Sequence, residues 1–77
     1  MDYKPKQIAK ADSMVGTKQK VYYPWEQKSI ERVIRKDEKG YYINYKGKRK
    51  GCRPQLNSFG EVIGFEALKY DGRWQGD

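Results

Sequence analysis

A dense run of positive side chains in the middle of the chain is the feature best able to bind a ligand. The segment Lys46–Arg53 (KGKRKGCR) holds five Lys and Arg residues and no acid. In an extended segment alternate side chains point to opposite faces, so Lys48 and Lys50 would share one side and Arg49 and Arg53 the other. A twisted hairpin could present all of them to a phosphate backbone. Each phosphate that they neutralise releases counterions, which makes the binding depend steeply on salt. We therefore predict that this run contacts nucleic acid. The alternative is a solvated hairpin tip that resists edge-to-edge aggregation.

Tyrosine and tryptophan side chains form the second set of residues that can contact a ligand. An exposed ring flanked by Lys or Arg can stack on an unpaired base, which contributes roughly 1–3 kcal/mol per base. Such a ring can also anchor a protein interface. We assign this role to Tyr42 and Trp25, and we expect Tyr41, Tyr45 and Phe65 to lie in the core. The predicted nucleic-acid-binding residues are Lys46, Lys48, Arg49, Lys50, Arg53, Arg32, Arg35, Lys36, Tyr42 and Trp25.

The residue types that catalysis needs are largely missing. The chain has no histidine, which removes the commonest general base and the commonest metal ligand. Glu61 and Glu66 are five residues apart on an expected strand, so their carboxylates would point to opposite faces and not converge on a metal. Gly47 and Gly51 lack the Lys-Ser or Lys-Thr pair that completes a phosphate-binding P-loop. We therefore expect no enzymatic activity, no cofactor and no metal site.

The single cysteine, Cys52, allows no disulfide within the chain. Cations of the neighbouring basic run could lower the pKa of its thiol and make it reactive. We expect instead that the thiol is half-buried and unreactive.

Length and charge limit the class of protein. With 77 residues the chain can form one small domain with a thin core. Its net charge of +7 favours polyanionic partners. No run approaches the roughly 18 apolar residues that span a bilayer, and the first residues lack the apolar segment of a signal peptide. We therefore expect a cytoplasmic protein with no membrane partner.

The N-terminal residues differ in composition from the rest of the chain. Residues 1–19 are rich in lysine and poor in apolar side chains, which predicts a flexible basic arm before a folded domain over 20–77. The alternative is a short helix between Pro5 and Gly16. The apolar side of that helix would consist of Ile8, Ala9, Ala11, Met14 and Val15.

From residue 20 onward, short runs of β-branched and aromatic residues alternate with turn residues, which predicts strands. The turns are expected at Asp37–Gly40, at Lys46-Gly47, at Asn57–Gly60 and at Asp71-Gly72. Five short strands joined in this way form an antiparallel meander, and so small a sheet protects its edges by coiling. We therefore predict an all-β, partly open SH3-like barrel. The strand segments are 21–25, a hairpin of 29–36 with 41–46, and then 48–56 and 61–68.

One of these expected strands carries a resemblance to a known family. Tyr41-Tyr42-Ile43-Asn44-Tyr45-Lys46-Gly47 resembles the Tyr-x-hydrophobic-x-Tyr-x-Gly strand of chromo-barrel and Tudor-knot domains. The resemblance covers seven residues and implies a small SH3-like barrel that binds nucleic acid or, through an aromatic cage, methylated lysine. Lys48-Arg49-Lys50 stands where that family has a segment rich in tryptophan and acids.

These features favour a small non-enzymatic module that binds DNA or RNA without marked sequence preference. The alternative is a protein-interaction module, such as a small regulator or inhibitor that docks on an acidic surface of a larger enzyme or nucleic-acid machine. A phage-encoded factor would fit that role. A homodimer formed through an edge strand near 20–25 or 61–68 is a further possibility.

Overall fold

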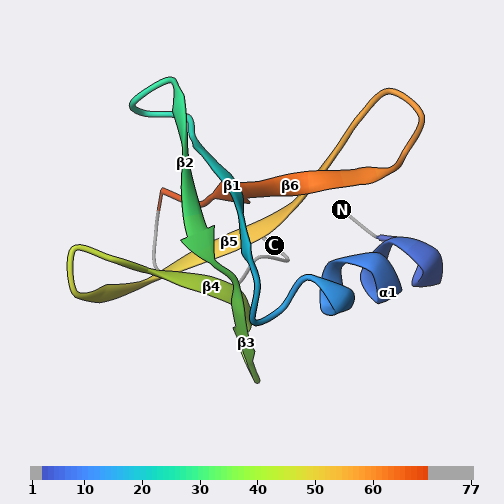
Figure 1. Ribbon diagram of the computed structural model, residues 1–77, viewed down its shortest axis with the longest axis horizontal. Helices are drawn as coiled ribbons and strands as arrows, with labels where there is room; N and C mark the ends of the chain where they lie inside the picture. The colour runs from blue at the N-terminus through green and yellow to red at the C-terminus, as the bar shows by residue number, and fades with distance from the viewer. Residues whose placement is uncertain (1–2, 70–77) are drawn as a thin grey trace.

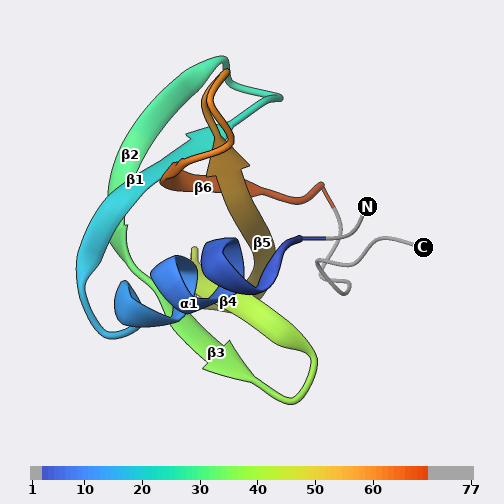
Figure 2. The same cartoon turned by 90° about the vertical axis from the view of Figure 1, so that its right-hand side faces the viewer.

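The computed structural model describes residues 3–69, in which one helix precedes a single curled sheet. The six strands lie in the order β2-β1-β6-β5-β4-β3 and form a half-barrel (Figure 1). The helix lies on the concave side of this sheet (Figure 2). The predicted all-β class is confirmed, but the sheet has six strands and not five. The elements are α1 (Pro5–Ser13), β1 (Lys18–Tyr23), β2 (Lys28–Val33), β3 (Arg35–Asp37), β4 (Gly40–Tyr45), β5 (Lys48–Leu56) and β6 (Val62–Ala67).

The expected hairpin of 29–36 with 41–46 is wrong, because the first segment is divided at Ile34. β2 pairs with β1, whereas the short β3 pairs with β4. The side chain of Ile34 is fully buried. Its backbone bonds to the loop after α1: the Ile34 N–H donates to the Thr17 carbonyl at 3.0 Å, and the Gly16 N–H donates to the Ile34 carbonyl at 2.7 Å. The chain therefore leaves one strand pair and enters another at this residue.

The expected antiparallel meander is also wrong in one pairing. β1 runs parallel to β6, with Val21 opposite Phe65 and Tyr22 opposite Glu66. Both strands are therefore interior, and the edges of the sheet are β2 and β3. The segments that we considered for dimerisation, 20–25 and 61–68, do not offer a free strand edge. β2 and β4 are not neighbours in the sheet, but the curl of the sheet brings them into contact.

Three of the expected turns lie where the sequence predicts them. Lys46 and Gly47 have φ values of 52° and 79°, the paired positive angles that suit a two-residue hairpin. Gly40 and Gly60 also adopt positive φ. The fourth predicted turn, at Asp71-Gly72, lies outside the described residues.

The N-terminal segment forms a helix where we expected a flexible arm. α1 begins with Pro5 at its first position, and the Lys4 N–H donates to the Gln7 Oε1 at 2.8 Å. Proline there has a suitable φ and loses no needed hydrogen bond. Ala11 is fully buried, and Met14 and Val15 pack against the core. The helix is stable in this place because the half-open sheet leaves apolar surface for it to cover.

The core lies between α1 and the concave face of the sheet. Tyr41, Ile43 and Phe65 are fully buried, which confirms the predicted inward face of 41–45, and Tyr45 is half-buried at its end. The ring centroids of Tyr41 and Phe65 lie 5.4 Å apart. The buried apolar residues are Ala11, Val21, Tyr23, Ile34, Tyr41, Ile43, Cys52, Val62, Phe65 and Ala67.

Asp12 joins α1 to the β3–β4 hairpin, and its replacement tests that connection. Its Oδ1 accepts hydrogen bonds from Lys36 Nζ at 2.8 Å and Tyr41 Oη at 2.6 Å. These bonds, the one from Lys36 first, hold the pKa of the Asp12 carboxyl below its ordinary value. We expect Asp12→Asn to lower the free energy of unfolding by about 1 kcal/mol at pH 7, a modest cost because the ion pair is half-exposed.

The effect of Asp12 must depend on pH in a defined direction. A carboxyl whose pKa is lower in the folded chain stabilises it above the unfolded pKa, and this contribution is lost as the pH falls through the folded value. The difference between wild type and Asp12→Asn should therefore shrink below about pH 4. Urea unfolding at several pH values measures it, with Glu38→Gln, in the exposed β3–β4 turn, as the control. A difference that grows in acid would contradict the assignment.

Candidate nucleic-acid interface

The β4–β5 hairpin divides the basic run between the two faces of the sheet. Lys48 lies opposite Tyr45 and Lys50 opposite Ile43, so both lysines are on the side that carries the core. Arg49 lies opposite Asn44, on the other side. The alternation that the sequence predicts is therefore confirmed, and the basic residues do not form one continuous surface.

Three aromatic rings meet beside the lysines of this hairpin. Trp25, in the β1–β2 turn, stacks on Tyr23 with ring centroids 5.4 Å apart and planes within 6°. Tyr45 meets both rings edge-on, at 5.3 Å from Tyr23 and 6.0 Å from Trp25. Tyr23 is fully buried whereas Trp25 is 40% exposed. The cluster thus extends from the core to the surface, and its exposed member is held by two neighbours.

Lysine ammonium groups lie over the rings of this cluster. Lys50 Nζ is 4.9 Å from the centroid of the Trp25 ring and 5.7 Å from that of Tyr45. Lys46 Nζ is 5.3 Å from the Tyr45 centroid. The cation–π attraction places positive charge beside an exposed ring, and the Glu26 carboxylate, which accepts a hydrogen bond from Tyr45 Oη at 2.8 Å, lies in the same cluster. We call Trp25, Tyr45, Lys46, Lys48 and Lys50 the hairpin-tip patch.

The opposite face carries arginines that are bound to carboxylates. Arg49 donates to Asp37 through Nε and Nη2, each at 3.0 Å, and its guanidinium lies 4.8 Å from the centroid of the Tyr42 ring. The Arg49 guanidinium beside Asp37 holds the pKa of that carboxyl below its ordinary value. Arg53 Nη2 lies 3.0 Å from Glu66 Oε1. A phosphate on this face would have to compete with carboxylates that are already in place.

The remaining predicted residues lie at other positions. Lys36 Nζ donates a hydrogen bond to Asp12 Oδ1 at 2.8 Å and lies 4.9 Å from the centroid of the Tyr41 ring. Arg32 lies on β2 near Tyr23: burial raises the pKa of the Tyr23 hydroxyl, and the positive charge of Arg32 partly offsets this rise. Arg35 is exposed on β3, opposite Tyr42.

The structure therefore brings together only part of the predicted set. Trp25, Lys46, Lys48 and Lys50 share one surface, whereas Tyr42, the other predicted stacking ring, lies on the other face of the sheet. Tyr45, which we expected in the core, is half-buried and belongs to this cluster. The Pro24-Trp25 turn between two strands is the feature that could have suggested it, because a turn brings its ring to the surface.

The Cys52 thiol is buried within the core and not merely half-buried. Burial raises its pKa to about 12, and the charge of Arg49 offsets this only in part. The raised pKa leaves very little thiolate, the reactive form, near neutral pH. We therefore expect a disulfide reagent such as dithionitrobenzoate to modify Cys52 slowly in the folded chain and rapidly in denaturant. A rapid reaction of the folded chain would contradict the buried position.

Two further features of residues 3–69 concern metal ions and membranes. Within this range no three Cys, Asp or Glu side chains are arranged so that they could hold a metal ion. The helix found there is too short to cross a membrane. No family model, curated protein or solved structure matches the chain significantly.

Proposed function

We propose that this chain is a small, non-enzymatic nucleic-acid-binding protein that uses the hairpin-tip patch. Lys46, Lys48 and Lys50 would contact phosphates, and Trp25 would stack on a base. The observation that carries the proposal is the partly exposed Trp25 ring, held against Tyr23 and approached by the Lys50 ammonium group at 4.9 Å. Rigid rings beside cations are the usual means of binding single strands.

The charge of the whole chain supports the same function. A net charge of +7 raises the local concentration of polyanions and speeds encounter, although it specifies no sequence. Arg32, Arg35, Lys36, Arg49 and Arg53 would contribute to this long-range attraction more than to direct contacts. Because stacking needs an unpaired base, we infer a preference for single strands over duplexes. The single strand can be DNA or RNA, and we propose that the protein binds it in the cytoplasm.

The fold suits this use. We interpret the curled sheet as a partly open SH3-like barrel whose mouth, between the β1–β2 turn and the β4–β5 hairpin, carries the ligand site. The protein-interaction function that the composition also suits would use a different surface, which lies beside α1.

Titration of labelled single- and double-stranded oligonucleotides at several salt concentrations tests the proposal. For a single strand the logarithm of the binding constant should fall against the logarithm of salt with a slope of about −0.7 per phosphate contact. Three lysine contacts would thus give a slope of about −2, with tighter binding to the single strand. No binding at low salt would overturn the proposal.

A further inference from the structure

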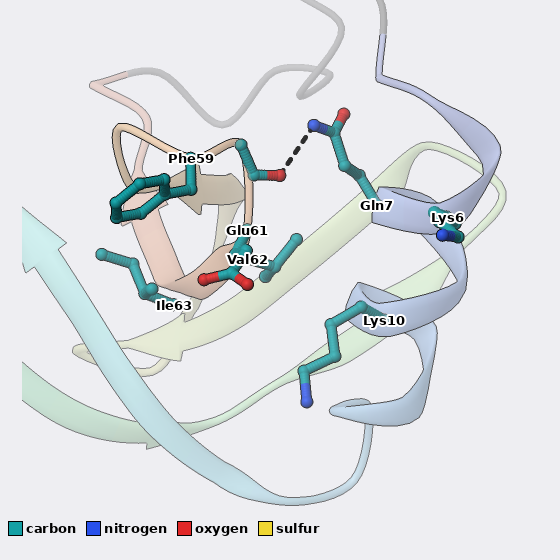
Figure 3. A pocket seen from close by; sticks show the side chains of 8 residues that line it. Lys6, Gln7, Lys10, Phe59, Glu61, Val62 and Ile63 are labelled. Carbon is teal, nitrogen blue, oxygen red and sulfur yellow. Dashed lines mark hydrogen bonds between the residues drawn. The ribbon is translucent and has the colours of Figure 1, made fainter.

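A groove separates α1 from the turn that joins β5 to β6. Its volume is about 610 Å³, and its two walls come from segments about 50 residues apart in the sequence. Figure 3 shows side chains of the helix on one side and of the turn and β6 on the other. The lining residues are Lys6, Gln7, Lys10, Phe59, Gly60, Glu61, Val62 and Ile63.

The turn that forms one wall is fixed by hydrogen bonds. Asn57 Oδ1 accepts from the backbone N–H groups of Phe59 and Glu61, each at 2.9 Å. Gln7 Nε2 donates to the Gly60 carbonyl at 2.9 Å and so ties the turn to α1 (Figure 3). Gly60 has a φ of +80°, which a side chain would strain. The turn therefore fixes the backbone position from which the exposed Phe59 side chain projects.

Two large apolar side chains are exposed at this groove. Phe59 is 86% exposed and Ile63 is 54% exposed, in a chain whose core is otherwise small. An exposed aromatic ring on a rigid turn loses little conformational freedom on binding and is a typical anchor of a protein interface. Their position together indicates a surface that a partner covers.

The charges of the groove indicate the chemistry of that partner. Lys6 and Lys10 are four residues apart on α1, so they lie on the same side of the helix, and both line the groove. Glu61, on the opposite wall, accepts a hydrogen bond from Asn57 Nδ2 at 3.0 Å. A complementary ligand has carboxylates toward the helix and apolar side chains toward Phe59.

Two other occupants fit these features less well. A second copy of the chain would bring a net charge of +7 and the same two lysines, which repel. An anionic membrane would attract the lysines, but a flat lipid surface does not fill a groove.

We propose that this groove binds an acidic, amphipathic segment of a partner protein. Apolar side chains of the segment pack on Phe59 and Ile63, and its carboxylates pair with Lys6 and Lys10. The site uses α1 and the β5–β6 turn, whereas the hairpin-tip patch uses the β1–β2 turn and the β4–β5 hairpin. A chain with both sites can hold a nucleic acid and a protein together.

Selection from a library of displayed random 15-residue peptides, with the full chain as target, tests the proposal. The enriched peptides should combine acids with aromatic or aliphatic residues. A synthetic peptide of the selected sequence should bind Phe59→Ala and Lys6→Glu/Lys10→Glu at least tenfold more weakly in fluorescence anisotropy. Its affinity should change less than twofold in the matched charge control Lys18→Glu/Lys39→Glu.

The outcome is independent of the proposed function, because a variant with Lys46, Lys48 and Lys50 changed to glutamate should still bind the selected peptide. Circular dichroism checks that each variant is folded, as expected for changes at exposed or half-buried positions. No enrichment, enrichment without acids, or equal binding to Phe59→Ala would each overturn the proposal. Binding to phosphatidylglycerol vesicles that depends on Phe59, without peptide enrichment, would assign the groove to a membrane instead.

Discussion

Replacement of Lys46, Lys48 and Lys50 with glutamate is expected to weaken the binding of single-stranded oligonucleotides at least about 100-fold at low salt. The change removes three positive contacts and places three negative charges beside Trp25. It also removes the Lys50 ammonium group that lies 4.9 Å from the Trp25 centroid. The salt slope of the residual binding should become shallower by about 2. Anisotropy of a labelled oligonucleotide at several salt concentrations measures both effects.

A second triple variant separates the effect of position from that of net charge. Lys18, Lys20 and Lys39 are exposed and lie outside the hairpin-tip patch. Their replacement with glutamate lowers the net charge from +7 by six, to +1, which is the same change as in the first variant. The control should lose much less affinity, because its lysines act only at long range. Equal losses in both variants would show that binding follows net charge alone.

The thermal unfolding midpoint of the first variant should stay close to that of the wild type. Lys46 and Lys48 are exposed, and Lys50 bonds outside the core to the Lys69 carbonyl at 2.8 Å. Loss of folding in this variant would mean that the hairpin lysines are structural.

Replacement of Phe65 with alanine is expected to lower the free energy of unfolding by about 3–5 kcal/mol. The Phe65 ring is fully buried, and its centroid lies 5.4 Å from the centroid of the Tyr41 ring. Phe65 is on an interior strand, opposite Val21 of β1 and Pro54 of β5. Removal leaves a cavity where β1, β5 and β6 meet, and a small domain has only about 5–15 kcal/mol of stability in total. We therefore expect the variant to be largely unfolded at 37 °C, as circular dichroism on heating would show.

The same substitution at the other phenylalanine provides the control. Phe59 is 86% exposed, so Phe59→Ala should change the free energy of unfolding by less than about 0.5 kcal/mol. If the two variants had similar midpoints, the assignment of Phe65 to the core would be wrong.

The features of the fold that depend on neighbouring residues could be predicted from the sequence. The Lys46-Gly47 turn needs two positive φ angles, which glycine and a polar neighbour tolerate. The alternation of Tyr41, Ile43 and Tyr45 toward the core follows from the period of a strand. Each of these inferences uses only a few consecutive residues.

The features that depend on distant residues could not be predicted in this way. The division of 29–36 at Ile34 depends on hydrogen bonds to Gly16 and Thr17, which no local pattern shows. The parallel pairing of Val21 with Phe65 joins the first and the last strand along the sequence. The sequence offered α1 only as the alternative to a flexible arm because its amphipathic pattern is short, and its docking requires the concave face that only the complete sheet provides.

The same distinction applies to the candidate site. The sequence predicts that Lys48 and Lys50 share a face, but the curl of the sheet brings Trp25 to Lys50 from a separate turn. Arg49 and Arg53 stand out in the sequence as phosphate contacts, yet Asp37 and Glu66 bind them. Those acids are 12 and 13 residues away along the chain, so the sequence did not reveal their pairing.

Titration of an unlabelled single-stranded oligonucleotide into ¹⁵N-labelled protein tests the central claim most directly. The claim predicts that the largest changes in chemical shift occur at the backbone amides of Lys46–Lys50 and at the indole N–H of Trp25. Comparison with the spectrum of Trp25→Phe assigns that indole signal. Shifts concentrated at Tyr42 and Arg49, or at Phe59 and α1, or no shifts at low salt, would contradict it.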